Sequence, residues 1–360
     1  MNEKIKKLEE TIETLVNKEG NVYFFTLDTK NAPNGEVKYM YDIALTLKNM
    51  GYNVTMLHQE EEFVGPLEWL GDKYDVLRHV NVKDENVTIT PSDFVFIPEV
   101  FSNVLSQTKM LPCKRIMIYY NPDYLIDYMP VGVTLNDLNI FDAITTNDTL
   151  KNKLKSYFPN VNVRVVRPSI NEAFINSDEP KKLIVNVITP TANEVNDIVK
   201  PFYWKNPVYK WVSFRDLKGI PQNVLADIMR EAAITVWADD NTSNAQMALE
   251  ALKSGSLLIA KVPQTPPEWM LENNDYRFGV IWVDSYDMLH EVLASVIRGW
   301  TRNEIIEKYL TMSEEVVDIF SPKHQETDVD KQIVNDIFEN TINTYRQILS
   351  AENNNVKDNE

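Results

Sequence analysis

The stretch ITVWADDNTSNAQMALEALKSGSLLIAK, residues 234–261, decides the predicted fold class. It opens and closes on short apolar runs, at 234–237 and 257–260, of the kind that form strands buried on both faces of a parallel sheet. Between these runs apolar residues recur at helical spacing, and Gly255 supplies a helix stop. The helical positions are Ala245, Ala248, Leu249 and Leu252. The stretch therefore predicts an α/β protein built on strand–helix–strand units.

The loop of this unit carries polar groups suited to a phosphate ligand. Thr242, Ser243 and Asn244 lie at the predicted helix start, where unpaired backbone N–H groups and the positive end of the helix dipole favour an anion. Glu250 lies two turns further on, and its carboxylate can accept hydrogen bonds from ribose hydroxyls. Together they predict a site for a nucleoside diphosphate sugar. The alternative is an ordinary unit of a doubly wound fold.

The N-terminal third of the chain repeats the same pattern. VYFFTL, residues 22–27, is followed by a polar loop with Asn34 and Gly35, a helix over 36–50 and a strand over 53–58. The loop lacks the G-x-G-x-x-G spacing that cradles a dinucleotide, which argues against an NAD enzyme.

In these residues the chain resembles the GT-B glycosyltransferases, especially the large retaining family related to glycogen and sucrose synthases. Members of that family carry a Glu, seven residues, a second Glu, and then a small-residue helix that ends at Gly. Glu250 in LEALKSGSLLIA matches the second Glu, whereas Thr242 stands in the place of the first, which lies near the donor sugar in the family.

The resemblance implies two Rossmann-like domains that face a cleft. GEVKYMYDIALTLKNMGYNVTML (35–57) resembles the first-domain segment of the family, and VRVVRPSINEAF (163–174) resembles its interdomain segment. The expected parts are an N-terminal helix over 1–20, an acceptor domain over 21–175, a nucleotide-sugar domain over 176–325, a helix over 326–350 that returns to the first domain, and a disordered tail over 351–360.

For the donor, the resemblance assigns Thr242, Ser243 and Asn244 to the diphosphate and Glu250 to the ribose. The family normally offers an Arg and a Lys near the ends of earlier strands of the second domain. Here Arg215 and Lys218, just after the strand WVSF, are the candidates for this role, and a plain surface pair is the alternative.

On the acceptor side, Asn34 and Gly35 lie where the family's glycine loop approaches the donor phosphates. The strand IMIYYNPD (116–123) ends where many members place a His, and this chain has Asn121 and Asp123 there. Asp123 would be the general base if the transfer inverts configuration. If configuration is retained, which the resemblance favours, donor phosphate can take the proton and Asp123 would orient groups. An ordinary turn residue is the alternative interpretation of Asp123.

The composition limits the other ligands. The 36 basic and 53 acidic residues give a net charge of −17, which argues against a nucleic acid partner. A single cysteine, Cys113, excludes an intrachain disulfide, and the four histidines show no pair at metal-ligand spacing, so we expect no metal and no cofactor. No stretch approaches the roughly 20 apolar residues of a membrane span, and MNEKIKKLEE is no signal peptide, so the expected location is the cytoplasm.

The predicted function is metal-independent transfer of a sugar from a nucleoside diphosphate sugar to an unidentified hydroxyl. One alternative is a GT-B protein that has lost catalysis and acts as a binding or assembly module, favoured by Thr242 and by the loop TPTANEV (189–195), which lacks a cation. The other is transfer to hydroxymethylated DNA bases, as in phage relatives of this fold, and the net charge weighs against it.

The N-terminal helix carries an apolar stripe of two heptads, formed by Ile5, Leu8, Ile12 and Leu15. So short a stripe must be covered, either by this chain or by a second copy. We favour self-association through residues 3–18, because this helix precedes a complete Rossmann unit.

Overall fold

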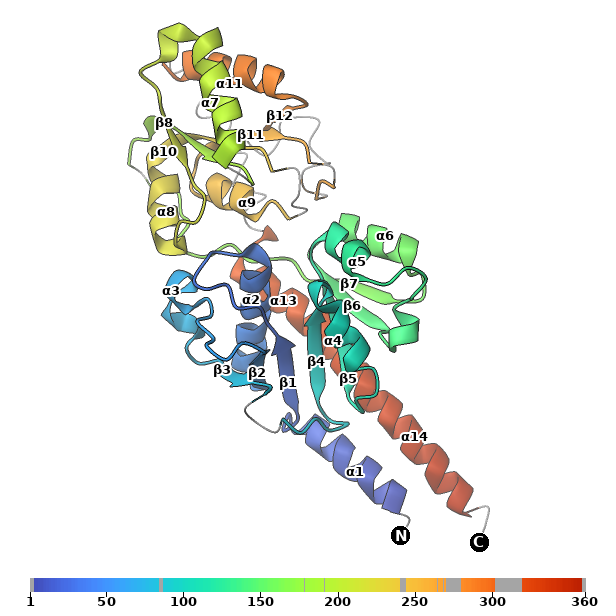
Figure 1. The fold of residues 1–360 in the computed structure, drawn as a ribbon. Coiled ribbons are helices and arrows are strands. Elements are labelled where there is room, and N and C mark those ends of the chain that lie inside the picture. Colours follow the sequence, from blue (N-terminus) through green and yellow to red (C-terminus); the bar gives the residue numbers. More distant parts are fainter. Residues whose placement is uncertain are drawn as a thin grey trace.

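Two parallel sheets organise the chain (Figure 1). The computed structural model describes residues 3–83, 87–177, 179–190, 192–239, 244–263, 265–267, 269, 280–301 and 319–357. Both sheets have helices on their faces, and they lie in two domains (Figure 1). Residues of both domains line a common cavity. The predicted α/β class with two Rossmann-like domains is confirmed.

Among the described residues, the first domain holds a seven-stranded sheet in the order β3-β2-β1-β4-β5-β6-β7. Its strands are β1 Asn21–Phe25, β2 Asn53–His58, β3 Arg78–Asn81, β4 Phe94–Pro98, β5 Lys114–Tyr119, β6 Asp142–Thr145 and β7 Asn162–Val165. Its helices are α2 Gly35–Asn49, α3 Leu67–Leu70, α4 Ser102–Gln107, α5 Pro122–Tyr128 and α6 Asp148–Tyr157, with 3-10 turns at Asp72–Tyr74, Glu99–Phe101 and Asn136–Leu138.

Among the described residues, the second domain holds a five-stranded sheet in the order β12-β11-β10-β8-β9. Its strands are β8 Lys182–Ile188, β9 Ser213–Asp216, β10 Ala232–Trp237, β11 Leu257–Lys261 and β12 Val280–Val283. Its helices are α7 Ala192–Lys205, α8 Gln222–Glu231, α9 Gln246–Lys253 and α11 Tyr286–Trp300, with a 3-10 turn at Pro207–Tyr209. β10 and β11 pair in parallel, with Ile234 opposite Leu257, as residues 234–261 predict.

Alternating side chains place a hydrophobic core on each face of each sheet. In β1, Val22 and Phe24 enter one core, while Tyr23 and Phe25 enter the core on the opposite face. This two-sided burial explains why the strands read as continuous apolar runs rather than as an alternation of polar and apolar residues. It also brings the carboxyl ends of the parallel strands to one edge of each sheet, where the connecting loops meet.

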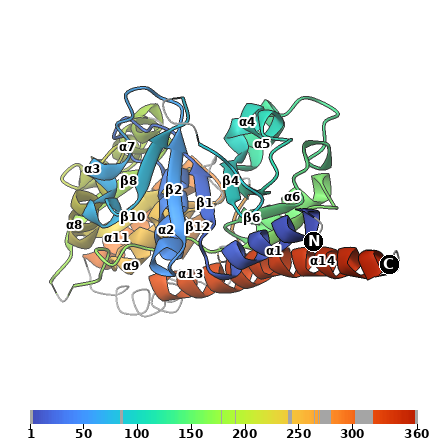
Figure 2. The ribbon, with the colours of Figure 1, turned by 90° about the horizontal axis from the view of Figure 1, so that it is seen from below.

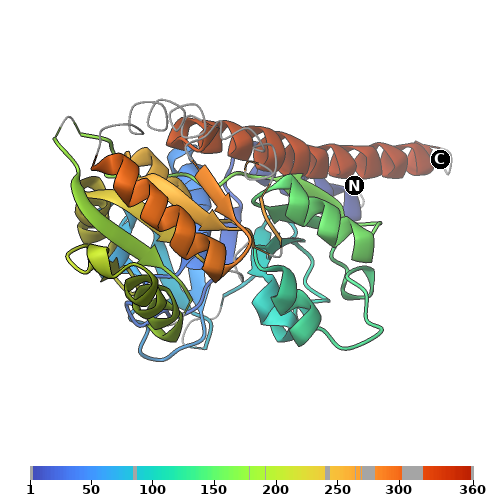
Figure 3. The same ribbon diagram turned by 90° about the horizontal axis from the view of Figure 1, so that it is seen from above.

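The C-terminal helix crosses back to the first domain, as expected (Figures 2 and 3). It comprises α13 Pro322–Asp328, a π-helical section Val329–Glu339 and α14 Asn340–Lys357. Phe338 stacks on Phe94 of the first sheet, with ring centroids 3.8 Å apart. The predicted disorder over 351–360 is wrong for 351–357, because α14 continues to Lys357 and Glu352 pairs with Lys4. Residues 358–360 lie outside the described part.

The N-terminal helix α1, Glu3–Val16, lies along α14 (Figure 2). Ile5 and Leu15 of its apolar stripe are buried, and Lys4 Nζ lies 2.5 Å from Glu352 Oε1. The stripe is therefore covered, at least in part, by this chain, while self-association stays a prediction. Among the described residues, no helix combines the length and apolar character needed to cross a membrane.

Candidate functional site

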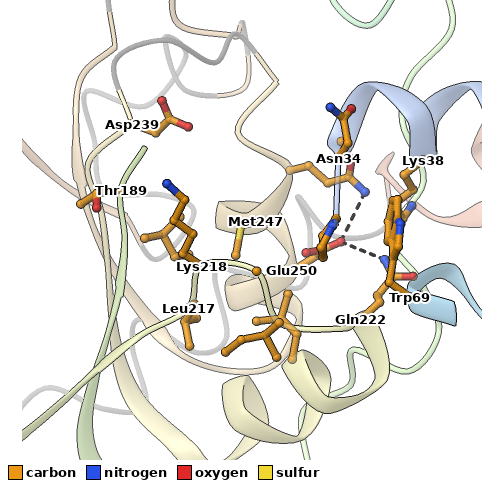
Figure 4. Close-up of a pocket in the computed structure, with 17 residues that line it drawn as sticks. Asn34, Lys38, Trp69, Thr189, Leu217, Lys218, Gln222, Asp239, Met247 and Glu250 are labelled. Carbon is orange, nitrogen blue, oxygen red and sulfur yellow. Dashed lines mark hydrogen bonds between the residues drawn. The ribbon is translucent and has the colours of Figure 1, made fainter. Parts of the chain in front are cut away.

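A cavity of about 220 Å³ lies between the two domains (Figure 4). Its second-domain wall comes from the carboxyl ends of β8, β9 and β10 and from helices α8 and α9, which is where open α/β sheets bind ligands. Its first-domain wall comes from the start of α2 and from Trp69. The lining residues used below are Asn34, Gly35, Lys38, Lys218, Gln222 and Glu250.

A second cavity, of about 230 Å³, adjoins the first on the side of β5 and α5. Residues shared by both linings show that the cavities are neighbours along one cleft. The shared residues are Asn34, Gly35, Ile188, Asp239, Gln246 and Met247. Tyr120, Asn121, Tyr124 and Trp237 line the second cavity alone.

The start of α9 faces the junction of the two cavities, because Gln246 and Met247 line both. The helix begins at Gln246, after Ala245 in the left-handed conformation with φ 48°, and among the described residues no side chain caps it. Its first N–H groups are therefore the donors that an anion would use. The sequence places the helix start at 242–244, which is too early. Thr242 and Ser243 lie outside the described residues.

Asn244 joins the two domains instead of opening onto the cleft. Its side chain is buried, and Oδ1 accepts a hydrogen bond from Thr146 Oγ1 of the first domain. Its side chain also hydrogen-bonds the hydroxyl of Tyr120. The expected diphosphate contact by Asn244 would require these two interdomain bonds to break.

Glu250 lies on α9 and lines the first cavity, with only 3% of its surface exposed (Figure 4). Gln246 Nε2, one turn earlier, donates to Glu250 Oε1 at 3.3 Å, and Gln222 Nε2 of α8 lies 3.5 Å from the same oxygen. Burial raises the pKa of Glu250 to about 7, and the nearby Lys38 ammonium only partly offsets that rise. The carboxyl group can therefore gain or lose its proton near neutral pH.

Lys38 brings a buried cation to the same cavity, and sequence reasoning missed it. Its Nζ lies 2.7 Å from Asp42 Oδ2 and donates to the carbonyl oxygen of Ser169 at 2.9 Å. Tyr74 donates its hydroxyl hydrogen to the other oxygen of Asp42. The signal was the four-residue spacing of Lys38 and Asp42 inside the otherwise apolar run VKYMYDIAL, since opposite charges so spaced pair on a helix.

Asn34 and Gly35 lie where the sequence predicts them, at the edge of both cavities. Asn34 caps α2, because its Oδ1 accepts a hydrogen bond from the backbone N–H of Val37 at 3.0 Å. Gly35 packs against Tyr120, and a Cβ added there would lie 2.7 Å from the tyrosine hydroxyl oxygen. A larger residue at this position would therefore have to displace the tyrosine side chain.

Of the two cations predicted to contact the donor, Lys218 lines a cavity and Arg215 does not. Lys218 lines the first cavity, and its Nζ donates to the carbonyl oxygen of Pro190 at 2.7 Å. Arg215 lines neither cavity and instead pairs with Glu231, with Nη1 and Oε2 2.5 Å apart. The structure supports the surface-pair alternative for Arg215 and leaves Lys218 available to a ligand.

Asn121 and Asp123, the two candidates at the end of β5, also lie in different environments. Asn121 lines the second cavity and caps α5 by accepting from the N–H of Asp123 at 3.0 Å. The Asp123 carboxylate is exposed, lies 3.8 Å from Lys153 Nζ and lines neither cavity. The turn interpretation therefore fits Asp123 better than the role of general base.

Sequence reasoning missed two buried carboxyl groups near the second cavity. Glu36, in the first turn of α2, lines this cavity with 5% of its surface exposed, and its Oε1 has no hydrogen-bond partner among the described residues. Glu99 is fully buried after β4, and its Oε1 accepts from the N–H groups of Tyr120 and Asn121 at 3.1 and 2.6 Å. The sequence offers only weak signals for either residue, since Glu is common in the first turn of a helix.

Burial governs the proton affinity of both groups. It raises the pKa of Glu36 to about 7. Burial, and then the neighbouring charge of Glu36, raise the pKa of Glu99 well above its usual range. Both groups therefore keep a proton to higher pH than an exposed glutamate does.

Known proteins were compared with this chain in sequence and in structure. No protein-family profile matches the chain. The pneumococcal O-GlcNAc transferase GtfA, solved in complex with UDP and GlcNAc, superposes with a TM-score of 0.64 at 8% identity, over 90% of this chain and 99% of that chain. Sucrose-phosphate synthase from Thermosynechococcus elongatus superposes with a TM-score of 0.60 at 10% identity, over 92% and 100%. The chain has the GT-B glycosyltransferase fold.

Two further proteins extend these likenesses. The Anabaena protein HepE, solved in complex with UDP-glucose, superposes with a TM-score of 0.60 at 8% identity, over 88% of this chain and 99% of that chain. In sequence, an alpha-1,6-glucosyltransferase from Actinobacillus pleuropneumoniae serotype 7 is 24% identical over 247 residues, which is 66% of this chain and 72% of the relative. The GT-B resemblance deduced from residues 234–261 is thereby confirmed for the fold.

Proposed function

We propose that this protein is a glycosyltransferase that moves a sugar from a nucleoside diphosphate sugar to an acceptor hydroxyl. The observation that carries this proposal is the first cavity, where the uncapped start of α9 and the buried carboxyl group of Glu250 lie side by side between the domains. Amide donors suit a diphosphate, and a carboxylate suits a ribose.

The charges around the first cavity fit a diphosphate. Lys218 lies on its second-domain wall, and Lys38, which pairs with Asp42, lies on its first-domain wall. Lys218 replaces the cation absent from the loop after β8. It donates to the carbonyl oxygen of Pro190, a bond that a phosphate oxygen can replace.

The donor that we propose is a uridine nucleotide carrying a glucose-type sugar. Two of the structural neighbours were solved with UDP or UDP-glucose, and the sequence relative is a glucosyltransferase. We further propose that the transfer needs no metal ion. The protein would then place the diphosphate charge on the α9 amides and on Lys218.

Turnover tests the proposal directly. The protein is incubated with UDP-glucose, UDP-N-acetylglucosamine or GDP-glucose, and release of UDP or GDP is followed, since donor hydrolysis is measurable before the acceptor is known. We expect UDP release from at least one UDP-sugar. Tight nucleotide binding without release would favour the alternative of a GT-B protein that only binds, and no nucleotide binding would refute the donor site.

A further inference from the structure

Two residues that line the second cavity each carry a buried acceptor atom without a hydrogen-bond partner among the described residues. Glu36 lines this cavity from the first domain and Gln246 from the second, and the unpartnered atom is Oε1 in each. Buried acceptors without partners are costly, so such atoms in a native cleft indicate a missing ligand.

The chemistry of these atoms limits the ligand that they can bind. A carboxyl oxygen and an amide oxygen both accept hydrogen bonds, so the ligand must present two donors across the cleft. The acidic side chains of Glu36 and Asp239, which both line this cavity, disfavour a phosphate or carboxylate. An uncharged molecule with hydroxyl groups fulfils both conditions.

Three aromatic side chains form part of the cavity wall. Tyr120, Tyr124 and Trp237 line it, and Trp237 is almost fully buried. Aromatic side chains offer apolar faces for the C–H groups of a sugar ring, while polar atoms at the rim bind its hydroxyls. Glu99 acts on this wall indirectly, because it accepts the N–H groups of Tyr120 and Asn121 and so fixes the turn that carries them.

We propose that the second cavity is the acceptor subsite for an uncharged carbohydrate, in which Glu36 and Gln246 each accept a hydrogen bond from an acceptor hydroxyl. The assignment rests on the proposed function, since it places the acceptor beside the donor cavity. Glu36 is then a residue that contacts the substrate, and Glu99 is a positioning residue. The subsite selects hydroxyl-rich neutral sugars over anionic ones.

Saccharide binding tests this subsite without knowledge of the natural acceptor. Saturation-transfer NMR is recorded with glucose, maltose, N-acetylglucosamine and glucuronate, both with UDP and without it. We expect at least one neutral saccharide to bind, and glucuronate to bind more weakly. Glu36→Ala should weaken that binding about ten-fold, because one hydrogen bond to the saccharide is lost, while UDP affinity stays unchanged. Glu36→Gln, which keeps an acceptor oxygen, should restore most of the binding.

Two controls make the outcome decisive. Glu61→Gln removes an exposed carboxylate of the first domain and should change nothing. The melting temperature of Glu36→Ala should not fall, because this change removes an unsatisfied buried group, whereas a structural carboxyl would lower it. The subsite is wrong if no neutral saccharide binds at tens of millimolar, or if binding ignores Glu36→Ala. The subsite is also wrong if Glu36→Ala weakens the binding of UDP-glucose but not that of UDP, since Glu36 would then contact the donor sugar. Loss of nucleotide binding alone would refute the proposed function instead.

Discussion

Thr146 of the first domain donates a hydrogen bond to Asn244 of the second, at the loop that leads into α9. This bond crosses the cleft beside both cavities, so the start of the donor helix is positioned partly by the other domain. Asn244 thus links the domains in this conformation, and its role as a domain contact is separable from its predicted role at the diphosphate.

Asn244→Ala distinguishes those two roles. The change removes the hydrogen bonds that the Asn244 side chain makes with the hydroxyls of Thr146 and Tyr120. A lost hydrogen bond between buried groups costs about 1–2 kcal/mol. We expect the free energy of unfolding in urea to fall by that amount, while UDP affinity changes by less than about three-fold. A ten-fold loss of UDP affinity at unchanged stability would instead assign Asn244 to the diphosphate.

Gly35→Ala tests the close approach between α2 and Tyr120. The new Cβ would lie 2.7 Å from the tyrosine hydroxyl oxygen, and overpacking of this kind costs about 1–3 kcal/mol. We expect lower thermal stability and weaker donor binding, because Gly35 lines both cavities. Adding Tyr120→Phe removes the clashing oxygen and should recover part of the stability. No recovery in the double variant would mean that another contact requires glycine.

The raised pKa of Glu250 predicts a pH-dependent stability. The folded protein holds this proton up to about pH 7, while the unfolded chain loses it near pH 4.5, so stability falls as pH rises between these values. Each pKa unit corresponds to about 1.4 kcal/mol, so the loss approaches roughly 3 kcal/mol above pH 7. Glu250→Gln cannot lose a proton, and it should match the wild type at pH 5 and exceed its stability at pH 8. Parallel pH profiles for the two proteins would show that Glu250 titrates normally.

Deletion of residues 3–16 separates the two interpretations of the N-terminal helix. Ile5 and Leu15 are buried and Lys4 pairs with Glu352 of α14, so the deletion should lower the melting temperature. Light scattering on the same samples tests the self-association that we still propose, since a dimer held by this helix would halve in mass. An unchanged melting temperature would contradict the packing of α1 on α14.

Much of the fold follows from local patterns in the sequence. Residues 234–261 carry two apolar runs, a helical repeat and a glycine stop, and each pattern is local, so it predicted the parallel pairing of β10 and β11. The family resemblance implied a helix over 326–350 that returns to the first domain, and Ile333 and Ile342 of that helix are buried in the core of the first sheet. The helix end was less predictable, because α14 beyond residue 350 is polar and gains support from Lys4 of a distant segment.

The site was predictable only where a motif reached it. Glu250, Asn34, Gly35, Lys218 and Asn121 all line the cleft, whereas Arg215 and Asp123 do not. Those two were chosen for their position after a strand, and that position does not fix which way a side chain points. Glu36 and Glu99 were missed because their significance depends on burial, which arises only when segments far apart in the sequence pack together.

Calorimetric titration of UDP-glucose at pH 8 tests the central claim most directly, because Glu250 is then ionised and the donor has no group that titrates near pH 7. We predict that UDP-glucose binds the wild type and that Glu250→Gln weakens its binding about ten-fold, since a hydrogen bond to a charged group is worth roughly 1.5–3 kcal/mol. Glu231→Gln, which alters a carboxylate outside both cavities, should bind as the wild type does. Equal affinity of the wild type and Glu250→Gln, or no binding of any nucleotide sugar to the wild type, would contradict the proposed donor site.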